Sequence, residues 1–237
     1  MKTILEEELE LLPKSEDLVE DLSIGARYIA LKLSSGKCAV SYRPREVFSY
    51  PEIKGKNAIS IAELALSDNL GERAIGITAI NALTKFPTPV RYGDPLDNLN
   101  VKDKVVATVG YFHPVIERFS SSAKELRVIE RRDMPNTYPP EKAEEILKEA
   151  SVVIITGSAL VYGGMEDYLE NSKNAEDVLV IGPTSSMHPE PFFRRGATMV
   201  GGIEILDSEK IFTSEKQCKD IFDVYTRKIY FARSDFY

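Results

Sequence analysis

Five short apolar runs in the second half of the chain constrain the fold more than any other feature. They are KVVATVGYF (104–112), ELRVIER (125–131), SVVIITG (151–157), DVLVIG (177–182) and ATMVGGIEIL (197–206). Segments with the pattern of amphipathic helices alternate with them, at 113–123, 140–150, 164–172, 188–196 and 214–228. Buried runs that alternate with helices predict an α/β fold with a mainly parallel sheet and helices on both of its faces.

The first part of the chain has a different rhythm. Its predicted elements are a helix over 1–23 interrupted near Pro13, a β-hairpin of strands 25–33 and 38–43, and helices over 58–69 and 71–85. The segment 86–100 holds three prolines and a glycine, which is typical of a linker. We therefore expect two domains, an α+β domain over 1–90 and an α/β domain over 91–237.

Composition narrows the classes of function. The 237 residues carry a net charge of −7, which argues against a nucleic-acid partner and is compatible with cation binding. No apolar run approaches the roughly 20 residues of a membrane span, and the N-terminus lacks the order of a signal peptide. The two cysteines, Cys38 and Cys218, form no CxxC motif and fit a reducing cytoplasm, with a single disulfide left open. A homodimer is common for such chains.

Polar residues follow the predicted strands at each exit. The exits read GYFHP (110–114), ERRD (130–133), TGSALVYGG (156–164) and GPTSSMHP (182–189), and the first of them includes Tyr111. In a parallel sheet these exits meet at one edge, so together they predict a ligand crevice. Each glycine or serine taken alone is equally typical of an ordinary loop.

The exit residues also limit the kind of ligand. The interval from Gly110 to Glu130 resembles that of a dinucleotide site, but the G-x-x-G that follows in such sites is missing. Gly157, Ser158 and the hydroxyls of 184–186 could donate to an anion or cap the following helices. We expect Ser185 and Ser186 to face the ligand and Thr184 to be structural.

Both histidines lie just past a predicted strand. His113 and His188, with Glu130, are a plausible ligand set for a transition-metal ion of unknown identity. Each histidine could instead cap a helix or bond a loop carbonyl, and His188 could act as a general base, although no nucleophile is identifiable beside it. Met187 is a soft metal ligand or a packing residue.

Asn81 stands in an otherwise apolar helix. A buried amide must be hydrogen-bonded, because an unpaired one costs on the order of 1–3 kcal/mol. It could satisfy neighbouring backbone groups or reach across the domain cleft to a ligand.

Four segments give the chain a family resemblance: AIGITAINAL (74–83), VIERRDMPNTYP (128–139), VVIITGSALV (152–161) and the run from Val178 to Asp207. They resemble the heavy-metal chelation family of largely uncharacterised prokaryotic proteins. The resemblance implies a small N-terminal domain like that of enolases, followed by a Rossmann-like domain. It also implies that a metal, or a small molecule that chelates one, binds in the cleft between the two domains.

The family's motifs fall on particular positions of this chain. They are Thr156, Gly157 and Ser158; Glu130 and Arg131; Gly182, Pro183, Thr184 and Ser185; and Asn81 and Ala82. The chain departs from the pattern at 162–164, where Tyr162 and two glycines replace an Asn and a Thr, so Tyr162 could serve the ligand instead. The alternative function is a transferase-like enzyme that acts on an anionic or nucleotide-like small molecule in the same cleft.

Overall fold

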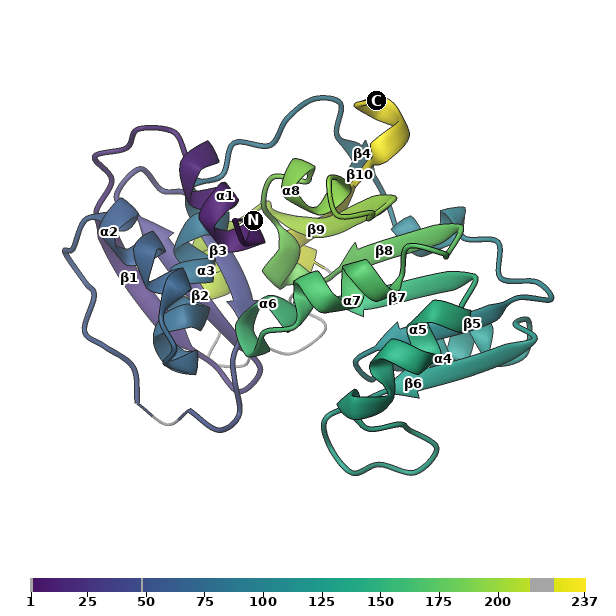
Figure 1. The fold of residues 1–237 in the computed structure, drawn as a ribbon. Coiled ribbons are helices and arrows are strands. Elements are labelled where there is room, and N and C mark those ends of the chain that lie inside the picture. Colours follow the sequence, from purple (N-terminus) through teal and green to yellow (C-terminus); the bar gives the residue numbers. More distant parts are fainter. Residues whose placement is uncertain (1, 48, 214–223) are drawn as a thin grey trace.

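A computed structural model describes residues 2–47, 49–213 and 224–237, which form two lobes (Figure 1). The first lobe contains a three-stranded antiparallel sheet in the order β1-β2-β3. Its strands are β1 (Val19–Ile24), β2 (Tyr28–Leu33) and β3 (Cys38–Tyr42). Its helices are α1 (Ile4–Leu11), α2 (Ala58–Ala62), the 3₁₀ turn η1 (Glu63–Leu66) and α3 (Leu70–Leu83).

The second lobe is built on a seven-stranded sheet in the order β4-β10-β9-β8-β7-β5-β6. The strands are β4 (Arg91–Tyr92), β5 (Val105–Val109), β6 (Glu125–Ile129), β7 (Val152–Thr156), β8 (Asp177–Ile181), β9 (Met199–Ile205) and β10 (Thr226–Ala232). Strands β5 to β9 pair in parallel, whereas β10 and β4 are antiparallel additions at one edge. The prediction of an α/β fold with a mainly parallel sheet is therefore confirmed.

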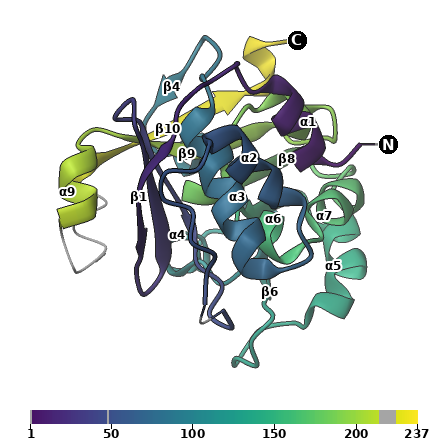
Figure 2. The same cartoon turned by 90° about the vertical axis from the view of Figure 1, so that its left-hand side faces the viewer.

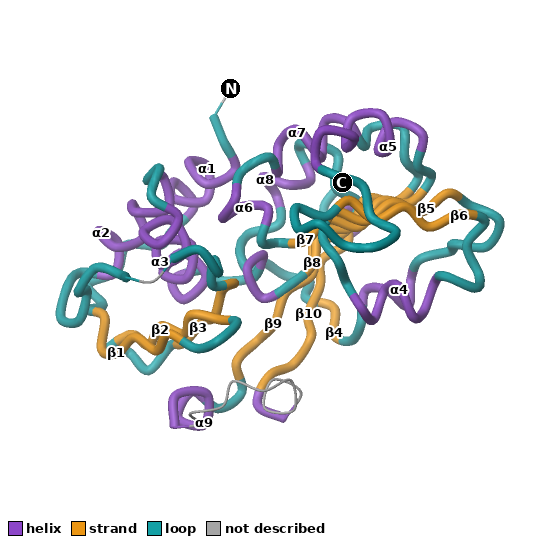
Figure 3. The backbone as a smooth tube through the Cα atoms, turned by 90° about the horizontal axis from the view of Figure 1, so that it is seen from below, coloured by secondary structure: helices purple, strands orange, loops and turns teal. Residues whose placement is uncertain are grey.

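Helices cover both faces of this sheet (Figure 3). On one face lies α4 (His113–Phe119), whose Val115 and Phe119 join a core cluster with Val152 and Ile154 of β7. On the other face lie α5 (Ala143–Glu149), α6 (Ala159–Tyr162), α7 (Met165–Asn171) and α8 (Glu190–Phe193). The alternation of side chains along β7 separates the two cores, because Val153 and Ile155 point to the second group of helices.

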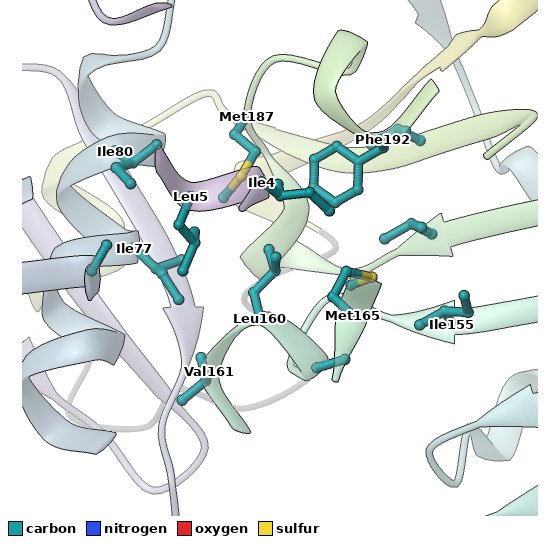
Figure 4. Close-up of a cluster of buried hydrophobic side chains, with 14 of the residues drawn as sticks. Ile4, Leu5, Ile77, Ile80, Ile155, Leu160, Val161, Met165, Met187 and Phe192 are labelled. Atoms are coloured by element: carbon teal, nitrogen blue, oxygen red, sulfur yellow. The ribbon is translucent and has the colours of Figure 1, made fainter. Parts of the chain in front are cut away.

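The two lobes share one hydrophobic core. Figure 4 shows Ile77 and Ile80 of α3 and the α1 residue Leu5 close to Leu160 and Met187 of the second lobe. Helix α3 is buried along almost its whole length, as expected for a helix that is packed on several sides. The helix α9 (Ser208–Thr213) lies beside the three-stranded sheet (Figure 2).

Two predicted helices are corrected by the structure. Helix α1 ends at Leu11, just before Pro13, and residues predicted to continue it form β1 instead. Proline lacks the N–H that a helix interior needs, so the chain leaves the helix there. The helix predicted over 214–228 falls mostly outside the described residues, as does Cys218, but residues from Thr226 onward form β10.

The predicted linker also contains a short strand. Arg91 and Tyr92 form β4, which pairs with β10 at the edge of the large sheet. In the described parts of the chain, no helix has the length and apolar character to cross a membrane.

Candidate functional site

The exits of four parallel strands lie side by side at the carboxyl edge of the large sheet. At the β5–β6 exits, the Gly110 N–H donates to the Ile129 carbonyl at 2.8 Å and the Tyr111 N–H donates to Glu130 Oε2 at 3.0 Å. A Cβ added to Gly110, whose φ is +98°, would lie only 3.0 Å from Cγ2 of Thr156 at the β7 exit. This glycine therefore allows two exits to approach closely.

The β7 and β8 exits are joined in the same way. The Gly157 N–H donates to the Ile181 carbonyl at 2.7 Å, and a Cβ on Gly157 would lie 2.9 Å from the Ser185 nitrogen. The chain runs from β5 to β6 on one side, and β7, which comes next in the chain, pairs with β5 on its other side. Ligands of open α/β sheets bind at such a switch point.

The first lobe covers this edge. The Tyr42 N–H donates to Thr184 Oγ1 at 2.9 Å, and the Tyr162 hydroxyl donates to Glu46 Oε2 at 2.9 Å. The rings of Tyr42 and Tyr162 lie 5.9 Å apart, centroid to centroid. Two residues of the first lobe that sequence reasoning missed, Tyr42 and Glu46, therefore lie at this edge. Their position depends on how the lobes pack, for which the sequence carries no local signal.

Glu130 holds the β5 and β6 exits together. Its carboxylate accepts hydrogen bonds from the N–H of Tyr111, the N–H of Arg132 and the Arg132 guanidinium, at 3.0 to 3.2 Å. Burial alone would raise the pKa of Glu130, but the bonds from Arg132 and Tyr111 outweigh it and lower the pKa below its usual value. Glu130 is therefore ionised at neutral pH, with both of its oxygens engaged inside the protein.

Arg131 is the available cation at this edge. Its guanidinium lies over the ring of Tyr162, 4.3 Å from the centroid, and the residue is exposed. Within the described chain no carboxylate forms an ion pair with it, whereas the neighbouring Arg132 is paired with Glu130. Burial raises the pKa of Tyr162, and so do Tyr42 and Glu46, so the ring under Arg131 stays a neutral phenol.

The β7 exit carries two hydroxyl groups on the segment that precedes Tyr162. Thr156 Oγ1 and Ser158 Oγ are 3.0 Å apart, and the Tyr162 N–H donates to the Ser158 carbonyl at 3.2 Å. Tyr162 therefore follows directly, by one helical turn, the segment that carries the two hydroxyls.

The hydroxyls of 184–186 lie in the interior, and each bonds within the chain. Ser185 Oγ donates to the carbonyls of Gly182 and Gly201, at 2.9 and 2.8 Å. Ser186 Oγ donates to the Pro183 carbonyl and accepts the Ile203 N–H, at 2.8 and 2.9 Å. The sequence predicts that both serines face the ligand. In the structure their hydroxyls bond backbone groups of Gly182, Pro183 and β9, so they hold β9 at the point where its neighbour β8 has ended.

Asn81 joins the two lobes. Its amide Nδ2 donates to the carbonyls of Pro183 and Thr184, at 3.1 and 3.2 Å, and more weakly to that of Val40 at 3.4 Å. Its Oδ1 is buried, with no hydrogen-bond partner in the described structure. The amide nitrogen therefore bonds backbone carbonyls, and the amide oxygen is left able to accept a hydrogen bond.

The two histidines belong to opposite faces of the sheet. His113 begins α4, is largely exposed, and has its Nδ1 3.3 Å from a Glu117 carboxylate oxygen. His188 precedes α8 on the other face and is half-buried, and its N–H donates to Glu8 Oε2 at 3.1 Å. Burial lowers the pKa of His188. The residues that the structure describes include no group of three His, Cys, Asp or Glu side chains that could hold a metal ion.

The structure is therefore that of a two-lobed, mixed α/β protein. The loops at the carboxyl edge of its parallel strands are polar and contact the first lobe. A family model described as "Putative heavy-metal chelation" matches residues 94–220, and a second model with the same description matches residues 7–84. The chain therefore belongs to this family, and the resemblance in its motifs is confirmed.

Three proteins are similar to this chain in sequence or in structure. An uncharacterised protein of Methanocaldococcus jannaschii is 29% identical over 163 residues, which cover 65% of this chain and 63% of that protein. A protein of unknown function from the same family in Desulfitobacterium hafniense has a TM-score of 0.82 at 22% identity, over 97% of this chain and 96% of its own. One from Pyrococcus horikoshii has a TM-score of 0.82 at 24% identity, over 97% of this chain and 98% of its own. The two solved structures show the same fold.

Proposed function

We propose that this protein binds a metal as a complex with an anionic organic chelator, in the crevice between the lobes at the carboxyl edge of the large sheet. The family description supports a metal in the ligand. The observation that carries the proposal is Arg131, a cation stacked on Tyr162 with no carboxylate partner among the described residues. A guanidinium in that state binds carboxylates through paired hydrogen bonds.

The donor set favours a chelate over a bare ion. A transition metal held by protein alone takes several His, Cys or carboxylate ligands. The ranges 2–47, 49–213 and 224–237 bring no three such side chains together. His113 begins α4 and His188 precedes α8, and these helices pack on opposite faces of the sheet. In the proposed complex the organic molecule supplies the metal's ligands, and the protein recognises the negative charge of the molecule.

The side chains of the proposed crevice would have different roles in binding. Arg131 would bind a carboxylate of the chelator, and the Thr156 and Ser158 hydroxyls would donate further hydrogen bonds. Tyr162 keeps the Arg131 guanidinium in place through the cation–π contact. Glu130 fixes the two loops without touching the ligand, since its oxygens are engaged by Tyr111 and Arg132.

Calorimetric titration with Ni²⁺, Co²⁺, Cu²⁺ and Zn²⁺, each alone and as its citrate or nitrilotriacetate complex, tests the proposal. We expect at least one anionic complex to bind, and Arg131→Gln to weaken that binding by about tenfold or more, since a charge-assisted hydrogen bond is worth about 1.5–3 kcal/mol. Arg227→Gln is the matched control, because Arg227 also lies over a tyrosine ring, at 4.0 Å from Tyr92, away from the crevice.

Two results would contradict the proposal. One is binding of the bare ions as tight as that of their complexes, which would place the metal directly on protein ligands. The other is no binding of any complex in the series.

An enzyme that acts on an anionic or nucleotide-like small molecule is the second candidate. The switch point between β5 and β7 and the same Arg131 favour it. Thermal unfolding with nucleotides and S-adenosylmethionine separates the two functions, since a ligand at 100 times its Kd stabilises a protein by about 2.7 kcal/mol. A shift with one of these, and none with metal complexes, would favour the enzyme.

A further inference from the structure

A separate cavity of about 380 Å³ lies between the two sheets. Figure 3 shows β3 and β9, the strands that border it, as neighbours. Its walls include Cys38 and Val40 of β3, Ile203 and Ile205 of β9, and Asn81 of α3. It contains none of the Arg131, Tyr162, Thr156 and Ser158 side chains of the crevice. The cavity is therefore a different site, and the question is what its walls recognise.

The β3 wall exposes unpaired backbone groups. The Leu33 N–H donates to the Lys37 carbonyl and the Arg43 N–H to the Arg27 carbonyl, so the odd-numbered residues of β3 are those bonded to β2. The even-numbered residues then point their N–H and C=O groups away from β2. Two contacts agree with this: the Tyr42 N–H reaches Thr184, and the Val40 carbonyl accepts from Asn81. The Val40 N–H and both backbone groups of Cys38 have no partner among the described residues.

The β9 wall has the same property. The Leu206 N–H donates to the Tyr225 carbonyl, so the even-numbered residues of β9 are bonded to β10. The odd-numbered residues face the opposite way, where the serine hydroxyls meet the Gly201 carbonyl and the Ile203 N–H. Beyond them, the Ile203 carbonyl and both backbone groups of Ile205 face the cavity without a partner in the described parts of the chain.

Two helices close the cavity above and below the strand edges. Ile211 of α9 packs with Val40 on one side, where Cys38, Ile203 and Ile205 join the same apolar cluster. On the other side lies Asn81, which is 6% exposed and whose Oδ1 has no partner in the described structure. The site thus offers donors and acceptors along two strand edges, one further amide acceptor, and an apolar surface.

We infer that this cavity binds an extended peptide segment, which enters between β3 and β9 as an additional strand. A peptide backbone is the chemistry that presents an N–H and a C=O on each edge in alternation, and it is what an unpaired strand edge recognises. The apolar cluster beneath the edges selects apolar side chains at alternate positions of the peptide. This site is independent of the proposed metal-chelate crevice.

A displayed library of random peptides of about seven residues, selected on the full-length chain, supplies the probe. We expect enriched sequences with alternating apolar residues. In hydrogen exchange on the unbound chain, the amides of Val40 and Ile205 should exchange faster than those of Ala39 and Leu206, which are bonded to neighbouring strands. A selected peptide should slow exchange at Val40 and Ile205 by about tenfold or more.

Val40→Pro removes the N–H that faces the cavity and leaves the β2–β3 ladder intact, so it should weaken peptide binding by about tenfold. Val40→Ala changes the same side chain and keeps the N–H, so it should bind the peptide more tightly than Val40→Pro does. If Val40→Pro does not fold, the exchange experiment on the unchanged protein decides. The inference is overturned if no peptide is enriched, or if the selected peptides leave the Val40 and Ile205 amides unprotected.

Discussion

At the scale of single residues, the Asn81 side chain links the two lobes by hydrogen bonds. Its Nδ2 bridges to the carbonyls of Pro183 and Thr184 in the other lobe. We expect Asn81→Ala to lower the free energy of unfolding by about 1–3 kcal/mol, because buried carbonyls lose their donor. Urea denaturation measures this. Asn174→Ala, at an exposed position, should change the same quantity by less than about 0.5 kcal/mol, and equal losses in both variants would refute the bridging role.

Glu8 is a buried carboxyl group whose single partner among the described residues is the His188 N–H. Burial raises the pKa of Glu8 well above its usual value, and the neighbouring Glu7 adds to the shift. A raised pKa in the folded state means that the stabilising contribution of this acid is complete below its unfolded pKa, near 4.5, and is lost as pH rises. Glu8→Gln keeps the shape and does not titrate.

We therefore expect Glu8→Gln to gain stability relative to the unchanged protein as pH rises from about 4 to 7, by on the order of 1 kcal/mol or more. Urea denaturation across this pH range measures the difference. Glu16→Gln, at an exposed position, corrects for the loss of one negative charge. A difference that stays constant with pH would show that burial does not perturb the pKa of Glu8, and one that shrinks would show that this pKa is lowered.

The residues of the proposed crevice show how far sequence reasoning reaches at this scale. Glu130, Arg131 and Thr156 could be placed at one edge in advance, because parallel strands send their exits to the same side. That Glu130 is engaged by Arg132, while Arg131 is left available, depends on the course of the loop. Their roles as ligand residues stay predictions.

At the scale of elements, Gly76 decides how closely α3 packs against η1. A Cβ at this position would lie 2.0 Å from the Ala65 nitrogen, a backbone atom that cannot move aside easily. Alanine in a helix is normally better than glycine by about 0.5–1 kcal/mol. We nevertheless expect Gly76→Ala to lower the free energy of unfolding by about 2 kcal/mol or more, since it forces the two elements apart.

Circular dichroism during urea denaturation measures this loss. Ser60→Ala alters one exposed position of α2 and should leave stability within about 0.5 kcal/mol. If Gly76→Ala proves as harmless as Ser60→Ala, the close approach of α3 and η1 is wrong.

Local sequence patterns predicted the strands that are buried on both faces. They failed for segments whose conformation depends on pairing with a strand elsewhere in the chain. The runs that became β5, β7 and β8 are buried on both faces, so their apolar sequence is sufficient. Half of the residues of β1 are polar, and the segment becomes a strand through its pairing with β2. Likewise β10 is defined by its antiparallel pairing with β9, which no periodicity within the segment reports.

At the scale of the whole molecule, the shared core determines whether the lobes unfold together. Leu5 and Ile77 of the first lobe and Leu160 of the second belong to one buried cluster (Figure 4). The division into domains at 1–90 and 91–237 stays a prediction about sequence, but no core cluster of the described residues lies within 1–90 alone. We therefore expect a single cooperative transition in urea, in which amides of β2 and of β7 lose their protection from hydrogen exchange together.

Two core variants test this coupling. Leu160→Ala, at the junction between the lobes, should lower the free energy of unfolding by about 2–5 kcal/mol. Val106→Ala lies in the cluster on the opposite face of the large sheet, which contains no residue of the first lobe. Because one transition includes both lobes, Val106→Ala should also lower the urea midpoint reported by the β2 amides. If the β2 amides keep the midpoint of the unchanged protein while those of β7 shift, the lobes unfold independently, and the Asn81 bridge and the buried junction do not couple them.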